Sequence, residues 1–205
     1  MNFSAEGFRI RARTARRSGG GPLWLFLKGF LKHPSSVASV VPSSKRLIER
    51  MLDPVDWSDA GLVVEYGPGV GVFTRAILER LPAEATLIAI DTNADFVDYL
   101  NATIGDNRLL AVTGSAARVR QIVADCGFKR ADHVLSGLPF STLPEGVGPR
   151  IARETHAVLR PGGAFLVYQF SPMVLRFIAP HFARIDRAFE WRNIPPANLF
   201  WAWKR

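Results

Sequence analysis

From about residue 60 onward, short apolar runs alternate with segments in which apolar residues recur every three or four positions. The runs, rich in Val, Ile and Leu, predict strands, and the three-to-four spacing predicts amphipathic helices. This alternation is typical of a parallel sheet with helices on both faces. The Arg-Pro-Gly-Gly sequence at 160–163 predicts a turn before the fifth strand. We expect strands at 62–66, 86–91, 109–113, 133–136, 164–170, 184–191 and 198–203, and helices at 72–81, 96–104, 116–126, 149–159 and 173–181.

The N-terminal segment differs from the rest in charge. The chain carries a net charge of +8, and residues 1–50 hold ten Lys or Arg against two Glu. The remaining residues carry sixteen basic and sixteen acidic side chains, so they are neutral overall. We therefore expect a basic arm over residues 1–45 and a globular domain over 46–205. Such an arm suits a polyanionic surface, either nucleic acid or anionic lipid.

Within the arm, residues 23–33 are apolar apart from cations spaced to share one helix face. The segment is too short to span a bilayer, which takes about 20 apolar residues, and it lacks a secretory cleavage site. One interpretation is an interfacial amphipathic helix, with Trp24 among the lipid headgroups and Lys28 and Lys32 facing lipid phosphate. The alternative is a helix or lid that packs its apolar face onto the domain.

Cysteine and histidine usage excludes two kinds of site. Cys126 is the one cysteine, and the four histidines are scattered along the chain. A disulfide framework and a zinc cluster both need several such residues at short spacings. We expect a reducing compartment and no bound metal.

A glycine-rich turn, Glu-Tyr-Gly-Pro-Gly-Val-Gly at 65–71, joins the first strand to the following helix. Glycines there allow positive φ and let the backbone approach a ligand closely. Twenty residues beyond the turn, Asp91 ends the second strand, where a carboxylate accepts hydrogen bonds from ribose hydroxyls. The candidate cofactor-binding residues are Glu65, Gly67, Pro68, Gly69, Gly71, Asp91 and Thr92.

The spacing of these residues favours one cofactor class. Dinucleotide enzymes favour G-x-G-x-x-G and hold a pyrophosphate, which Glu65 would repel. The same carboxylate can engage the ammonium of S-adenosyl-L-methionine, which has no phosphate. The Glu-x-Gly-x-Gly-x-Gly pattern, with Asp91 and the Leu-Arg-Pro-Gly-Gly turn at 159–163, resembles class I methyltransferases. That resemblance implies S-adenosyl-L-methionine as cofactor and a Rossmann-like, seven-stranded, mostly parallel sheet.

After the third strand, class I methyltransferases often place an acidic residue against the adenine amine. This chain has Gly-Ser-Ala at 114–116 instead. The resemblance therefore implies that Ser115, or its backbone together with Ala116, takes that role.

The loop Ser-Gly-Leu-Pro-Phe at 136–140 follows the fourth strand, where it would face the cofactor's methyl group. It resembles the Asn-Pro-Pro-Tyr or Asn-Leu-Pro-Tyr motif of amino methyltransferases, whose amide oxygen and backbone carbonyl hold the target nitrogen beside an aromatic ring. Gly137 stands in place of the Asn, which argues for an aliphatic amine and against a stacked nucleobase. An ordinary Gly-Pro turn is the alternative. We take Leu138 and Phe140 as candidate catalytic residues, and Ser136 and Gly137 as cofactor contacts.

Together with a serine-rich stretch at 36–44, these motifs resemble bacterial phospholipid N-methyltransferases over most of residues 23–205. The resemblance implies stepwise methylation of phosphatidylethanolamine towards phosphatidylcholine, with the N-terminal helix docked on the cytoplasmic face of the inner membrane. Ser39, Ser43 and Ser44 would bind the lipid phosphate or the cofactor's carboxylate. Capping of the next helix by Ser43 or Ser44 is the alternative.

Two further side chains are candidates for the chemistry. Tyr168, at the end of the fifth strand, would accept a hydrogen bond from the amine or offer its π face to a quaternary ammonium; core packing is the alternative. The substrate's ammonium must lose a proton before attack, and His156 and His181 are candidate bases, although a lone helical histidine is more often structural. We expect Trp191, Trp201 and Trp203 to pack the last strands against the core.

Three other functions compete with this interpretation. An RNA adenine N6-methyltransferase would share the cofactor core, but the missing Asn, the lack of a C-terminal nucleic-acid module and the apolar aromatic helix beside the basic residues argue against nucleic acid. A small-molecule amine methyltransferase fits if the arm is a lid. A non-catalytic lipid-binding protein would not need the intact glycine turn with Glu65 and Asp91.

Overall fold

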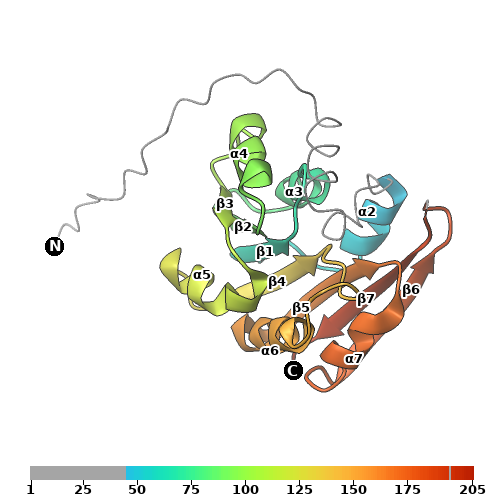
Figure 1. Ribbon diagram of the computed structural model, residues 1–205. Coiled ribbons are helices and arrows are strands. Elements are labelled where there is room, and N and C mark those ends of the chain that lie inside the picture. Colours follow the sequence, from blue (N-terminus) through green and yellow to red (C-terminus); the bar gives the residue numbers. More distant parts are fainter. Residues whose placement is uncertain (1–44, 194) are drawn as a thin grey trace.

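The computed structural model describes residues 45–193 and 195–205 (Figure 1). The predicted arm therefore lies outside the described residues, apart from its last position. Trp24, Lys28, Lys32, Ser39, Ser43 and Ser44 lie outside them too, and their roles stay predictions. Among the described helices, none has the length and apolar content needed to cross a bilayer.

Seven strands form one sheet through the middle of the domain. They are β1 (Leu62–Tyr66), β2 (Thr86–Asp91), β3 (Leu109–Thr113), β4 (Ala131–Ser136), β5 (Leu159–Gln169), β6 (Arg184–Glu190) and β7 (Ala197–Trp203). Their order is β3-β2-β1-β4-β5-β7-β6, with β1 to β5 parallel and β7 antiparallel to both of its neighbours. The predicted Rossmann-like, mostly parallel sheet is confirmed.

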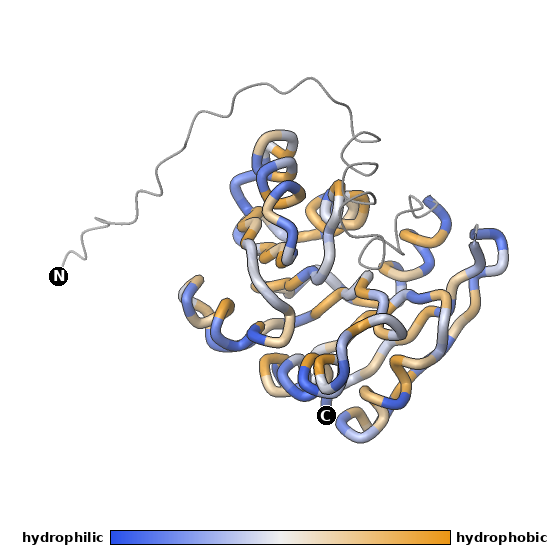
Figure 2. Tube along the Cα trace, viewed as in Figure 1, coloured by the Kyte–Doolittle hydropathy of each residue, from blue (hydrophilic) through white to orange (hydrophobic). Residues whose placement is uncertain are grey.

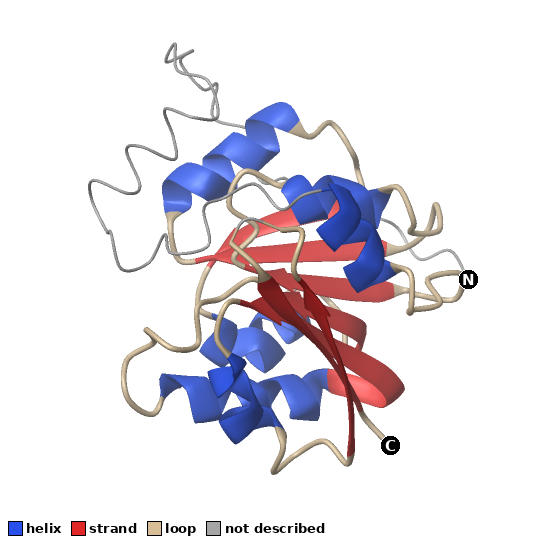
Figure 3. Cartoon of the chain, turned by 90° about the vertical axis from the view of Figure 1, so that its right-hand side faces the viewer, coloured by secondary structure: helices blue, strands red, loops and turns tan. Residues whose placement is uncertain are grey.

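Helices cover both faces of this sheet. The helices are α2 (Lys45–Leu52), α3 (Val72–Leu78), α4 (Ala94–Thr103), α5 (Val119–Asp125), α6 (Val147–Val158) and α7 (Leu175–Ile178), with 3-10 turns η1 (Ala116–Arg118) and η2 (Pro172–Val174). Figure 1 shows α2, α3 and α4 on one side and α5, α6 and α7 on the other, and Figure 3 shows helices on both sides of the sheet. The predicted helix at 173–181 is shorter than expected, because it is a 3-10 turn followed by α7, which ends at Ile178.

Alternation along the central strands builds two apolar layers. On β1, Val64 and Tyr66 pack in the layer beneath α5 and α6, whereas Val63 packs in the layer beneath α2 and α3. A parallel strand covered on both faces is apolar almost throughout, which explains the near-continuous hydrophobic runs in the sequence. Figure 2 shows the helices with hydrophilic and hydrophobic segments alternating along the tube, as expected of amphipathic helices.

The turn predicted at 160–163 is wrong, because these residues lie within β5. Leu159 pairs with Ala131, and the register shifts before Ala164 pairs with His133. A side-chain carbon at Gly163 would collide with the backbone of the neighbouring strand, and Gly162 has a φ of 77°. The glycines therefore allow a register shift inside a strand. Sequence alone does not distinguish such a site from a turn, because both favour glycine.

Helix α2 is fastened to the last two strands. The indole nitrogen of buried Trp201 donates to the carbonyl oxygen of Met51 at 2.9 Å. Glu190, 1% exposed at the end of β6, pairs with Arg46 at 3.4 Å and Arg50 at 3.0 Å. Trp201 thus packs as predicted, but the expectation for Trp191 is wrong, since it follows the end of β6 and is 64% exposed.

A buried histidine makes the stability of this fold depend on pH. His133, 4% exposed on β4, packs edge-on against Trp57, and burial lowers its pKa to about 4. An unfolded chain has a histidine pKa of about 6.5, so between these pH values the unfolded chain binds a proton that the folded protein excludes. Stability from this residue is therefore lost as pH falls from 6.5 towards 4.

We expect His133→Phe to remove this dependence. Relative to the variant, the wild-type free energy of unfolding should fall by about 3 kcal/mol between pH 7 and pH 4. Urea unfolding at both pH values measures this difference. An equal loss in both proteins would contradict the assignment to His133.

Candidate functional site

The glycine turn between β1 and α3 has the backbone conformation that a close ligand contact requires. Gly67, Gly69 and Gly71 all have positive φ, at 66°, 55° and 79°. The amide of Gly67 donates to the carbonyl oxygen of Ile90 at 2.9 Å, which ties the turn to β2. No atom lies within 4 Å of the position where Gly69 would carry a side chain, so the backbone there is open to a ligand. Pro68 is buried between these glycines.

Glu65 lies beneath this turn, on the side of the sheet that faces α3. It is 2% exposed, and its carboxylate accepts a hydrogen bond of 2.6 Å from the hydroxyl of Thr74. Burial raises the pKa of Glu65 to about 8, opposed by the Thr74 hydrogen bond, with the nearby Asp91 adding a smaller upward effect. Thr74 was not predicted from the sequence, although a polar residue on the buried face of an apolar helix indicates a buried hydrogen-bond partner.

Asp91 ends β2 next to the turn. Its carboxylate accepts a hydrogen bond of 2.9 Å from the amide of Asn93, whose own side chain caps α4. Burial raises the pKa of Asp91, opposed by the amides of Asn93, Gly69 and Thr92. The structure thus brings Asp91 to the glycine turn as predicted, while Thr92 is exposed.

The Gly-Ser-Ala segment after β3 lies at the same edge. The amide of Gly114 donates to the carbonyl oxygen of Asp91 at 2.8 Å. The Ser115 hydroxyl accepts from the amide of Ala117 and so caps η1, while Ala116 is buried. The predicted adenine contacts are therefore next to the predicted ribose contact, and their role stays a prediction.

The loop after β4 is held by hydrogen bonds on both sides. The hydroxyl of Ser136 accepts from the amide of Leu138 at 3.2 Å. The carbonyl oxygen of Leu138 accepts from the side-chain amide of Gln169 at 2.7 Å. Phe140 is 2% exposed and packs on Phe177, 6.1 Å between ring centroids. Gln169, which fixes the Leu138 carbonyl, was not found from the sequence.

Gly137 is in close contact with Tyr168. A side-chain carbon at Gly137 would lie 2.8 Å from Cζ of Tyr168 and closer still to its hydroxyl oxygen. The Tyr168 ring is stacked on Phe73 of α3, with 4.5 Å between ring centroids and 23° between planes. The phenol therefore occupies the space in which an Asn side chain would start, which explains why this position is glycine.

His156 is not brought to this site. It lies in the last turn of α6, whereas the loop after β4 leads into the first turn. Its ring packs against Phe182 and His181, and Lys204 binds its carbonyl oxygen. The proposal of His156 as a base is corrected here, because the length of α6 carries it to the opposite edge of the sheet from the glycine turn.

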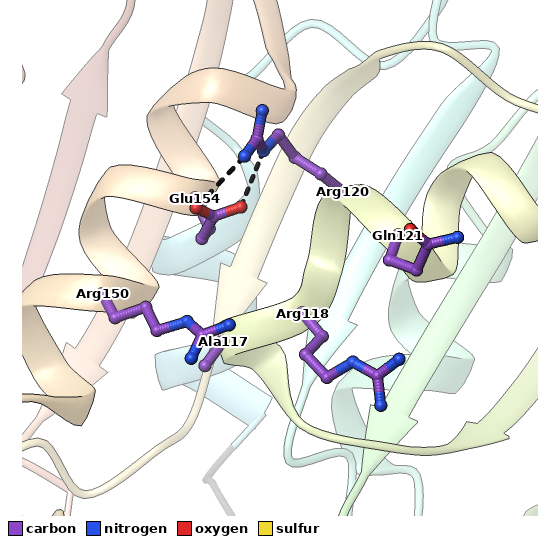
Figure 4. Close-up of a pocket in the computed structure, with 6 residues that line it drawn as sticks. All are labelled: Ala117, Arg118, Arg120, Gln121, Arg150 and Glu154. Carbon is purple, nitrogen blue, oxygen red and sulfur yellow. Dashed lines mark hydrogen bonds and ion pairs between the residues drawn. The ribbon is translucent and has the colours of Figure 1, made fainter.

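A basic hollow of about 440 Å³ lies between η1–α5 and α6 (Figure 4). Arg118, Arg120 and Arg150 line it, with Glu154 as the acidic residue. Arg120 binds Glu154 at 2.7 Å, and that hydrogen bond lowers the pKa of the carboxyl. Three guanidinium groups against one carboxylate leave the hollow positively charged, a feature that the sequence did not reveal.

Comparison with known proteins agrees with this geometry. Residues 63–163 match the family described as methyltransferase domain. An ornithine lipid N-methyltransferase from Singulisphaera acidiphila is 32% identical over 179 residues, covering 86% of this chain and 93% of that protein. A ribosomal RNA small subunit methyltransferase A from a Sulfurihydrogenibium species is 30% identical over 108 residues, 42% of each chain.

The solved structure of N-methyltransferase NodS from Bradyrhizobium japonicum, in complex with S-adenosyl-L-homocysteine, shares the fold. Its TM-score is 0.60 at 12% identity, over 77% of this chain and 87% of that one. S-adenosyl-L-homocysteine is the demethylated form of the cofactor that the glycine turn and Asp91 predicted. The chain therefore belongs to the class I S-adenosylmethionine-dependent lipid N-methyltransferases, the family of the Singulisphaera enzyme, and S-adenosyl-L-methionine is its methyl donor.

Proposed function

We propose that the enzyme methylates the aliphatic head-group amine of a membrane lipid. The observation that supports this proposal is the 32% sequence identity to an ornithine lipid N-methyltransferase over 86% of this chain. Ornithine and ethanolamine both present a primary amine on a flexible carbon chain. The relative favours ornithine lipid as the substrate, and phosphatidylethanolamine, the substrate predicted from sequence, is the second candidate.

The residues at the carboxyl edge of the sheet fit S-adenosyl-L-methionine. The open backbone at Gly69 would admit the amino-acid end, the buried carboxyl of Glu65 would pair with its ammonium, and Asp91 would accept hydrogen bonds from the ribose hydroxyls. When bound, the cofactor supplies an electrophilic methyl group: a nitrogen–carbon bond forms as the sulfonium carbon–sulfur bond breaks, and the nitrogen releases a proton. The chain's own task is to hold a neutral amine in line with that methyl group.

We infer that Tyr168 and the Leu138 carbonyl perform that task. Tyr168 lies near the end of β5 and Leu138 in the loop after the adjacent strand β4, and both are fixed, the ring by Phe73 and the carbonyl by Gln169. A carbonyl oxygen has a second lone pair, so it can accept an N–H from the amine while bound to Gln169. We propose that the phenol oxygen of Tyr168 replaces the amide oxygen of the Asn found in related amino methyltransferases.

An RNA substrate has less support. The ribosomal RNA methyltransferase matches less than half of this chain and less than half of its own length. The contact between Gly137 and Tyr168 also removes the Asn-type acceptor expected for a planar nucleobase amine.

We further propose peripheral attachment to the cytoplasmic face of the inner membrane. The support is the charge distribution, in which residues 1–50 account for the net charge of +8 beside an apolar segment containing Trp24. A lipid substrate requires contact with a membrane surface, because its head-group amine stays at the bilayer surface.

The first prediction concerns Glu65 and cofactor affinity. With a pKa of about 8, Glu65 is protonated in the free protein at pH 6 and must release its proton to pair with an ammonium. We expect wild-type affinity for S-adenosyl-L-methionine to rise by about tenfold per pH unit between pH 6 and 7.5. Calorimetry should show that the cofactor affinity of Glu65→Gln does not change with pH. The control is Glu79→Gln, at an exposed position at the end of α3, and its affinity should depend on pH as in wild type. Equal pH profiles in Glu65→Gln and wild type would rule out the ammonium contact.

The second prediction concerns Tyr168. Tyr168→Phe should keep cofactor affinity but slow methyl transfer by about tenfold or more, because one of two acceptors for the amine is lost. Gly137→Ala should lower Tm by forcing the phenol away, and the double variant should regain part of that loss. Single-turnover rates and thermal unfolding measure these effects. A full rate in Tyr168→Phe would remove the phenol from the proposed mechanism.

The third prediction concerns the substrate. The full chain, incubated with radiolabelled S-adenosyl-L-methionine and vesicles containing ornithine lipid or phosphatidylethanolamine, should transfer label to the lipid, with ornithine lipid preferred. Thin-layer chromatography identifies the mono-, di- and trimethylated products. The control is Asp91→Ala, which should lose cofactor binding and therefore transfer no label. If the cofactor binds but neither lipid is labelled, the lipid proposal fails and soluble amines and RNA become the candidates.

A further inference from the structure

Exposed apolar side chains are concentrated at one place on the described surface. Five large hydrophobic side chains are exposed in the part of the chain that the structure describes, at 36% to 64%. One of them, Leu110, lies on the outer strand β3. The other four, which we call the apolar rim, are Phe170, Met173, Phe189 and Trp191.

Strand register places the apolar rim at the edge of the sheet that carries the site. Gln169, the last residue of β5, pairs with Asn198, which in turn pairs with Phe189 of β6. Phe170 and Trp191 directly follow the ends of these two parallel strands. The loop after β4, with Gly137 and Leu138, leaves the sheet at the same edge. The apolar rim thus flanks the proposed amine site instead of being scattered over the surface.

The charges around the apolar rim are basic. The guanidinium of Arg192 lies 4.8 Å from the centroid of the Trp191 ring. Glu190, the acidic residue between Phe189 and Trp191, is buried and paired with Arg46 and Arg50. On the other flank of the same edge lies the basic hollow of Arg118, Arg120 and Arg150 (Figure 4).

We propose that the apolar rim inserts into an anionic bilayer surface as a membrane contact of the catalytic domain itself, separate from the N-terminal arm. This inference rests on the proposed lipid substrate. Exposed Trp and Phe beside arginines suit the boundary between headgroups and acyl chains, where the Phe rings enter the apolar layer and the Trp indole keeps its N–H among polar groups. An apolar patch next to a site is typical of an interaction surface, and the basic neighbours select an anionic partner.

This membrane contact would bring the proposed amine site to the lipid head groups. A lipid amine reaches the site only if this edge of the sheet touches the surface in which the lipid is anchored. Because the apolar rim and the loop after β4 belong to the same edge, insertion of the rim brings that loop to the headgroups. The bonds between α2 and Glu190 hold the end of β6 in place, so the depth of insertion is fixed relative to the site.

The test uses the full chain with vesicles of phosphatidylglycerol and phosphatidylethanolamine. We expect the Phe189→Ser, Trp191→Ser double variant to lose about tenfold or more in vesicle partitioning, since two aromatic rings no longer enter the interface. Leu110→Ser, which removes an exposed apolar side chain on β3, at the opposite end of the strand order from β6, is the matched control and should partition as wild type. Both variants should keep wild-type Tm and cofactor affinity, because the changed side chains are exposed.

A second readout separates the apolar rim from the arm. Brominated lipids should quench more fluorescence in wild type than in Trp191→Phe, because the exposed indole enters the bilayer. Undiminished partitioning of the double variant, or equal quenching in both proteins, would overturn the proposal. If light scattering shows a wild-type dimer that the double variant dissociates, while partitioning is unchanged, the rim is an interface between copies instead.

The outcomes also separate this inference from the proposed function. Methylation of lipid in detergent micelles should be unchanged in the double variant and reduced in vesicles. If wild type methylates lipid and the double variant does so equally in vesicles, the apolar rim has no role while the function stands. If wild type labels no lipid, yet partitioning still depends on Trp191, the function fails and the membrane contact stands.

Discussion

Parallel strands that end at a common edge determine where the chemistry of this protein lies. Tyr66 pairs with Ile90 on one side and with Ser136 on the other, so three strands release their loops side by side, with neighbouring strands about 4.8 Å apart. The glycine turn, Asp91 and the loop after β4 are brought together by that register alone. Because a slip of one residue would turn Glu65 to the opposite face, the apolar layers that set the register also set the site.

At this edge, Glu65 and Tyr168 are held in surroundings that favour a partner with positive charge or N–H donors. Glu65 sits under the turn with its pKa raised, which means that the free protein holds a neutral carboxyl where an ammonium is expected. Its ionised form becomes favourable only with a cation beside it. The ring of Tyr168 is stacked on Phe73, and its phenol fills the space left by the missing side chain at Gly137. Little side-chain freedom is left to lose when an amine is held there.

Sequence patterns predicted the elements well because apolar periodicity reports burial, and burial built the two layers. They also located Glu65, the glycines and Asp91, whose spacing along the chain is set by one strand-helix-strand unit, from β1 through α3 to β2. They failed where distant segments meet. Thr74, Gln169 and the stack of Phe73 on Tyr168 depend on pairing between strands and helices that no local pattern encodes. His156 was misplaced for a related reason: composition identified a titratable group, but helix length decided which edge it reached.

The exposed aromatic residues follow from the same architecture. Helices cover both faces of the sheet and leave its strand ends open to solvent. Of the five large apolar side chains exposed among the described residues, Phe170, Phe189 and Trp191 lie at the ends of β5 and β6, and Met173 lies in η2, just beyond β5. Those ends have no structural need for Phe or Trp, since turns are satisfied by small polar residues. Their position beside the loop after β4 therefore requires an external explanation. A bilayer that holds the substrate supplies one, because a lipid amine and the protein surface that receives it must lie in the same plane.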